Sequence, residues 1–168
     1  MTDSELMQLS EQVGQALKAR GATVTTAESC TGGWVAKVIT DIAGSSAWFE
    51  RGFVTYSNEA KAQMIGVREE TLAQHGAVSE PVVVEMAIGA LKAARADYAV
   101  SISGIAGPDG GSERSLSAPS GLLLPPPAAK VLPGGNASAV TVMRCVVRLL
   151  RMHCRPCGNN FYKTLDTV

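Results

Sequence analysis

Apolar residues recur along the first two thirds of the chain with a spacing that alternates between helix and strand. Steps of three and four residues separate Leu6, Leu9, Val13 and Leu17. This spacing predicts an amphipathic helix, and Gly21 is a suitable residue to end it.

The alternation continues to about residue 113. β-Branched and aromatic runs predict strands at 22–26, 53–56 and 98–102. Helical patterns lie between them, at 34–40, 57–65 and 69–75, with a longer helix that starts at 79–81. Serine as N-cap and proline in the first turn mark the start of that longer helix. Strands that alternate with helices predict a layered α/β fold, and in such folds ligands gather at the carboxyl ends of the strands.

Three polar loops follow the predicted strands, at 27–33, 56–61 and 103–111. In the first loop, backbone N–H groups at a helix N-terminus could hold a phosphate or an oxyanion. Ser29 or Thr31 could act there as a nucleophile. The alternative is a plain strand-to-helix turn in which the hydroxyl groups only cap the helix.

The second and third loops offer a base and a close approach to a ligand. Ser57 and Lys61 are four residues apart and share a helix face, and a buried lysine with a lowered pKa can act as a base. A solvated lysine beside a capping serine is the alternative. The loop from Ser103 to Gly107 could approach a ligand closely because glycine lacks Cβ. No cluster of His, Cys, Asp or Glu has metal-ligand spacing, so we expect no metal site.

The formal net charge of +0 conceals two oppositely charged parts. Residues 1–113 hold eight basic and fourteen acidic residues, for a net charge of −6. Residues 114–168 hold seven basic residues and one acidic residue, for a net charge of +6, together with six of the eight prolines. We therefore divide the chain into an α/β domain over 1–113 and an atypical tail over 114–168.

The acidic first part argues against a nucleic-acid partner. The chain starts with an acidic segment rather than a signal peptide, and no run approaches the roughly 18 apolar residues of a membrane-spanning helix. We therefore expect a cytoplasmic protein without a membrane partner.

Five motifs in a fixed order resemble the CinA C-terminal domain family. They cover nearly all of residues 5–112 and are 26–33 (TAESCTGG), 44–46 (GSS), 54–61 (VTYSNEAK), 76–79 (GAVS) and 103–108 (SGIAGP). The last motif has Ser103 where the family has threonine, which keeps the hydroxyl group. The chain resembles the stand-alone bacterial members of this family, the nicotinamide-nucleotide amidohydrolases.

The resemblance implies a three-layer α/β/α domain that deamidates nicotinamide mononucleotide to nicotinate mononucleotide and ammonia. It implies no cofactor, a small-molecule nucleotide as substrate and a homodimer or higher oligomer. Amide hydrolysis is acyl transfer and needs a nucleophile, a base and an oxyanion site.

We assign these roles to residues of the matching motifs. Ser29 is the expected nucleophile, Lys61 the base and Tyr56 a proton-relay or orienting group. Ser46 and a directly activated water remain alternative nucleophiles. The oxyanion or phosphate is expected at Thr31, Gly32 and Gly33, and the nucleotide at Ser46, Asn58, Ser103, Gly104, Ala106 and Gly107.

The resemblance stops near residue 113. A family-like Lys-Pro-Val-Gly-Thr-Val-Trp can be encoded as AAG CCT GTC GGC ACC GTC TGG. Read from the second base, the same DNA encodes Ser-Leu-Ser-Ala-Pro-Ser, which is residues 115–120 of this chain. We therefore hypothesise a one-nucleotide frameshift and expect a poorly ordered C-terminal third. A divergent natural tail is the alternative.

Two other functions remain open on the sequence alone. The chain could be a nucleotide-binding module without catalysis, or an inactive product of the frameshift.

Overall fold

The computed structural model describes residues 3–104, 120–124 and 130–131. Five strands form one sheet in the order β2-β1-β3-β4-β5. Their bounds are β1 Val24–Glu28, β2 Phe49–Val54, β3 Tyr98–Ser103, β4 Ser120–Leu124 and β5 Lys130–Val131. The first three strands are parallel, β4 pairs antiparallel with β3, and β5 pairs antiparallel with β4. Strand β4 lies within the predicted frameshifted tail.

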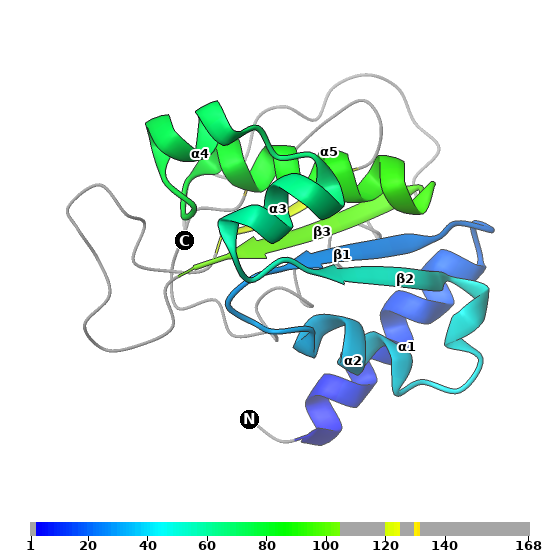
Figure 1. The fold of residues 1–168 in the computed structure, drawn as a ribbon. Helices are drawn as coiled ribbons and strands as arrows, with labels where there is room; N and C mark the ends of the chain where they lie inside the picture. The colour runs from blue at the N-terminus through cyan, green and yellow to red at the C-terminus, as the bar shows by residue number, and fades with distance from the viewer. Residues whose placement is uncertain (1–2, 105–119, 125–129, 132–168) are drawn as a thin grey trace, which may run out of the picture.

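Helices cover both faces of the sheet, as Figure 1 shows. They are α1 Asp3–Lys18, α2 Trp34–Thr40, α3 Asn58–Ile65, α4 Glu69–His75 and α5 Glu80–Ala94, with a short 3-10 helix, η1, at Ser45–Ala47. Helices α1 and α2 lie on one face and α3, α4 and α5 on the other. The predicted three-layer α/β/α arrangement is therefore confirmed around the parallel strands.

Each face has its own apolar core. Helices α1 and α2 pack Leu17 and Val35 against Val24 of β1 and Val100 of β3. On the other face, Ala27 of β1 packs with residues of α3, α4 and α5. Because side chains alternate along a strand, Val24, Thr26 and Glu28 point to the α1–α2 face. Glu28, the last residue of β1, can therefore reach α2.

Two strands differ from their sequence predictions. Strand β1 lies two residues later than expected, so that it ends on Glu28, and β2 starts at Phe49 rather than at residue 53. Strand β2 is the sheet edge, and Glu50 and Arg51 are exposed there. An exposed edge strand lacks the apolar run that reveals a buried one.

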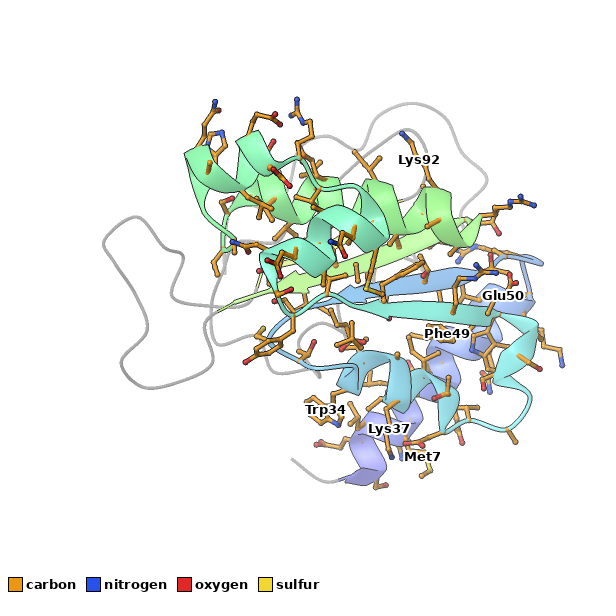
Figure 2. All side chains as sticks on the ribbon, in the orientation of Figure 1. Met7, Trp34, Lys37, Phe49, Glu50 and Lys92 are labelled. Atoms are coloured by element: carbon orange, nitrogen blue, oxygen red, sulfur yellow. The ribbon has the colours of Figure 1, made fainter. Side chains whose placement is uncertain are left out.

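The surface between α3 and α5 carries a groove of about 550 Å³, which we call the α3–α5 groove. Its lining includes Met64, Ile65, Arg68, Glu85, Gly89 and Lys92. Figure 2 shows Lys92 extending from α5, while Trp34 and Lys37 extend from α2 in the opposite layer. No helix in the described ranges has the length and apolar character needed to cross a bilayer.

Candidate active site

Ser29 and Lys61 meet at the carboxyl ends of β1 and β2. The Lys61 Nζ atom lies 3.0 Å from Ser29 Oγ. The two residues are 32 positions apart in the sequence and both are buried, with exposed fractions of 1% for Lys61 and 6% for Ser29. The structure thus brings together the nucleophile and the base predicted from separate motifs.

Lys61 is buried, and backbone carbonyls surround its amine. Its Nζ also donates to the backbone carbonyls of Thr55 at 2.8 Å and Tyr56 at 3.3 Å. Burial lowers the pKa of Lys61 below its ordinary value, with a smaller opposing effect from the Cys30 thiol. A lysine that loses its proton more readily is a better general base near neutral pH.

Local structure explains how Lys61 reaches this place. Ser57 caps α3, and its Oγ accepts a hydrogen bond from the Ala60 amide at 3.0 Å. Lys61 therefore lies one turn into the helix on its inner face. The helix ends at Gly66, whose φ of 68° lies in the left-handed region that glycine adopts readily.

Backbone hydrogen bonds hold the three parallel strands together beside the pair. The Ser29 amide donates to the Ile102 carbonyl at 2.9 Å, and the Thr55 amide donates to the Glu28 carbonyl at 2.7 Å. The site is thereby built on the sheet rather than on a free loop.

The start of α2 is already occupied by a carboxylate of the chain itself. Glu28 is fully buried, and its carboxylate accepts hydrogen bonds from the amides of Val35 at 2.9 Å and Ala36 at 2.8 Å. The Thr31 hydroxyl donates to the same carboxylate at 2.7 Å. The expectation that this helix end presents free donors to a phosphate is therefore wrong for these two amides.

The glycines of the first loop have different environments. The Gly32 amide donates to the Ser29 carbonyl at 3.0 Å, so it is not a free oxyanion donor. Gly33 has a φ of 96° and immediately precedes α2. Thr31, Gly32 and Gly33 thus shape the turn beside Ser29, and Thr31 binds Glu28.

Tyr56 and Asn58 lie beside the pair with exposed side chains. Tyr56 is 67% exposed and reaches Lys61 only through its backbone carbonyl. Asn58 is the first residue of α3. The ring of Tyr56 is therefore placed to meet a ligand from solvent rather than to relay a proton inside the buried pair.

The remaining predicted binding residues are dispersed. Ser46 lies in η1, just before β2, at the amino end of the parallel strands. It therefore lies at the opposite end of the parallel strands from Ser29. Ser103 is buried and its hydroxyl donates to the Ala77 carbonyl at 2.8 Å. Gly104 follows it, while Ala106 and Gly107 lie outside the described residues.

Cys30 lies between Ser29 and Thr31 and is partly buried. Burial raises the pKa of its thiol, with a smaller raising effect from the Glu28 carboxylate, although the amides of Cys30 and Thr31 and the nearby Lys61 lower it. Because the thiolate is the reactive form, burial makes Cys30 a weaker nucleophile than an ordinary exposed cysteine.

Comparison with known proteins identifies the family of the chain. Residues 6–124 match the CinA C-terminal domain. The chain belongs to the CinA C-terminal domain family. It is 69% identical over 112 residues to a nicotinamide-nucleotide amidohydrolase of Enterobacter agglomerans, and the match covers 67% of this chain and 68% of the relative. It is also 60% identical over 107 residues to a CinA-like protein of Chloroherpeton thalassium, covering 64% of this chain and 26% of that protein.

Two solved structures have the same fold as this chain. A competence damage-inducible protein A from Klebsiella pneumoniae superposes with a TM-score of 0.74 at 38% identity, covering 88% of this chain and 94% of that one. A competence or damage-inducible protein from Enterobacter asburiae gives a TM-score of 0.75 at 30% identity, covering 88% and 95%. The chain therefore spans most of these domains but only about a quarter of the CinA-like relative.

Sequence reasoning missed two features of this CinA-family site. It placed Glu28 in the loop, although Glu28 ends β1 on the same face as Val24, and that alternation was the available signal. It also missed the Thr55 carbonyl as a partner of Lys61, for which side-chain patterns carry no signal. Within the described ranges, no group of three or more His, Cys, Asp or Glu residues is arranged to hold a metal ion.

Proposed function

We propose that this chain hydrolyses the carboxamide of nicotinamide mononucleotide, with Ser29 as nucleophile and Lys61 as base. One observation carries the proposal, which is the buried contact of 3.0 Å between Lys61 Nζ and Ser29 Oγ. The printed function of the relative from Enterobacter agglomerans supports the substrate.

The two carbonyls around Lys61 orient it as a base. A neutral amine has two hydrogens and one lone pair. The carbonyls of Thr55 and Tyr56 can only accept, so they take the two hydrogens. In this neutral form the lone pair is left for the hydroxyl hydrogen of Ser29, so the bond in which Nζ donates to Ser29 Oγ is reversed.

Acyl transfer follows from this arrangement. Ser29 Oγ attacks the amide carbon while its proton passes to Lys61, and a C–O bond forms. Lys61 then gives the proton to the departing nitrogen as the C–N bond breaks, which releases ammonia. Water attacks the resulting ester, its proton passes through Lys61 to Ser29 Oγ, and nicotinate mononucleotide leaves.

The oxyanion donors belong to groups other than those already bonded. The Ser29 and Gly32 amides already donate to backbone carbonyls, so among the groups predicted from sequence our candidates are the Gly33 amide and the glycine loop from Gly104. Among the residues predicted from sequence, Tyr56 and Asn58 are exposed beside the pair and are our candidates for nucleotide contacts.

Ammonia release tests the proposal. The purified chain is incubated with nicotinamide mononucleotide, and ammonia and nicotinate mononucleotide are quantified for the parent, Ser29→Ala and Ser46→Ala. We expect Ser29→Ala to abolish both products. Full activity in Ser29→Ala would contradict the assignment, and loss confined to Ser46→Ala would favour the alternative nucleophile.

Binding without turnover would identify a nucleotide-binding module instead. Calorimetry with nicotinamide mononucleotide detects that case, because heat of binding would appear in a chain that releases no ammonia. We also propose a cytoplasmic homodimer, as family membership implies; light scattering on the purified chain tests the dimer.

We further propose that residues from about 114 are encoded out of frame. The two curated relatives described above align over only 107 and 112 residues, and the proline and charge composition changes at the same point. Sequencing the gene tests the frameshift, and an intact in-frame gene would contradict it. A frame-restored chain should release ammonia faster than the present one.

A further inference from the structure

The carboxylate of Glu28 is a fully buried charged group beside Ser29 that the proposed chemistry does not use. It accepts three hydrogen bonds, from the Thr31 hydroxyl at 2.7 Å and from the amides of Val35 and Ala36 at 2.9 and 2.8 Å. Hydrogen bonds to an ionised acceptor are about twice as strong as neutral ones.

These three bonds close the segment that contains the nucleophile. Glu28 is the last residue of β1, Thr31 lies within the turn, and Val35 and Ala36 lie in the first turn of α2. The carboxylate therefore joins the strand before Ser29 to the turn and the helix after it. On the opposite side, the Ser29 amide is fixed to the Ile102 carbonyl.

We propose that Glu28 is a positioning residue that holds Ser29 Oγ at hydrogen-bond distance from Lys61 Nζ. It acts by fixing the turn, and it does not touch the substrate. The inference rests on the proposed function only for the role of Ser29 as nucleophile. Misplacing a reacting atom by about 1 Å can reduce a rate about 100-fold, so a group that fixes this turn controls turnover.

The chemistry of the three donors explains why a carboxylate is needed. An amide side chain has one acceptor oxygen and an NH₂ group that only donates. Glu28→Gln therefore places an NH₂ group against at least one of the donors. The turn must shift to separate them, and Ser29 shifts with it.

Glu85 provides a matched control within the same chain. Its carboxylate also accepts from a backbone amide, that of Arg68 at 2.9 Å, and from a threonine hydroxyl, that of Thr71 at 2.8 Å. It thus supports the start of α4 as Glu28 supports that of α2, but it lies at the α3–α5 groove. Glu85→Gln measures the effect of losing such a carboxylate away from Ser29.

Two measurements on the full chain test the proposal. The first is kcat and KM for nicotinamide mononucleotide. The second is the rate at which phenylmethanesulfonyl fluoride modifies Ser29, followed by mass spectrometry of the Ser29 peptide. In that reaction Ser29 Oγ bonds to sulfur and fluoride leaves, so it reports on the serine and its base without the nucleotide.

We expect Glu28→Gln to lower kcat and the labelling rate by about 10- to 100-fold, with KM changed less than about threefold. Glu85→Gln should leave both rates near those of the parent chain. Equal rates in the two variants, or a change in KM alone, would overturn the proposal. If the parent releases no ammonia but is labelled at Ser29, the substrate is rejected and labelling still tests Glu28. If the parent neither releases ammonia nor is labelled at Ser29, both proposals fail.

Thr31 variants keep the test decisive if Glu28→Gln does not fold. Thr31→Val has nearly the same shape and removes only the hydroxyl that donates to Glu28. Thr31→Ser keeps that donor. Slower labelling in Thr31→Val than in Thr31→Ser is expected, and equal labelling would overturn the proposal.

Discussion

The carboxyl ends of β1 and β2 and the α3–α5 groove use the same residue types in opposite ways. At the strand ends, Lys61 and Glu28 are buried and bind backbone groups and hydroxyls. In the groove, Arg68 and Lys92 are exposed, and Arg68 forms an ion pair with Glu85 at 2.7 Å. Water screens the second set of charges but not the first.

The two regions differ in how burial and hydrogen bonds act on the charge of a side chain. Desolvation lowers the pKa of Lys61. In the groove, desolvation acts to raise the pKa of Glu85, but hydrogen bonds from Arg68 and Thr71 outweigh it and leave the pKa below its ordinary value. Lys61 therefore loses its proton more readily than an ordinary lysine, while Glu85 stays charged more readily than an ordinary glutamate.

Replacing one lysine in each region should give the largest difference in activity between two variants. Lys61→Met removes the proposed base and should reduce kcat/KM for ammonia release by about 100- to 10,000-fold. Lys92→Met removes an exposed lysine of the groove and should leave it unchanged. A parent-like rate in Lys61→Met would show that the base lies elsewhere.

The pH dependence should follow the buried lysine. Only the neutral amine accepts the proton of Ser29, so kcat/KM should rise about tenfold per pH unit below the pKa of Lys61 and level off above it. Because burial lowers that pKa, the midpoint should lie below 10.5. A rate that falls as pH rises towards that midpoint would exclude a lysine base.

In the groove, the sensitive position is a glycine rather than a charge. A Cβ added at Gly89 would lie 1.7 Å from the Ile65 carbonyl oxygen, so α3 and α5 would have to separate. Alanine normally stabilises a helix interior relative to glycine, but this clash should outweigh that gain. Gly89→Ala should lower the free energy of unfolding by about 1–3 kcal/mol in a urea titration, and an unchanged midpoint would contradict the close contact.

The smallest effect should come from breaking the exposed ion pair. Arg68→Ala should lower the melting temperature less than Gly89→Ala does. Added salt should further reduce the difference in melting temperature between Arg68→Ala and the parent chain. The pKa of Glu85 is lowered in the folded chain. The contribution of its charge to the stability of the fold is therefore present above the ordinary glutamate pKa and lost as pH falls through the lowered value. A larger loss at high salt than at low salt would contradict this account.

The helices were predictable because their ends carry local signals. The predicted range 34–40 matches α2, and Ser57 and Gly66 mark the ends of α3. Strand β2 was harder, because Glu50 and Arg51 are exposed at the sheet edge and break the apolar pattern. The apolar pattern of a sequence identifies elements that bury one face, so it does not identify elements that are exposed.

The predicted site divides along the same line. Ser29 and Lys61 were found because their motifs follow parallel strands, whose carboxyl ends meet at one edge. Ser46 was expected at the same ends of the strands. The chain instead returns along α2 to the amino ends of the strands before it reaches Ser46. The partners of Glu28 and Lys61 are largely backbone groups, and side-chain patterns do not locate those.

The hydrogen bonds that join the three strand ends also couple assembly of the site to folding. The Ser29 amide is bonded to β3, and the Thr55 amide to β1. Both protons are protected while these strand ends stay paired, so both should exchange with deuterium more slowly than amides of the exposed loops. The serine and the lysine can therefore meet only while the ends of the three parallel strands are paired.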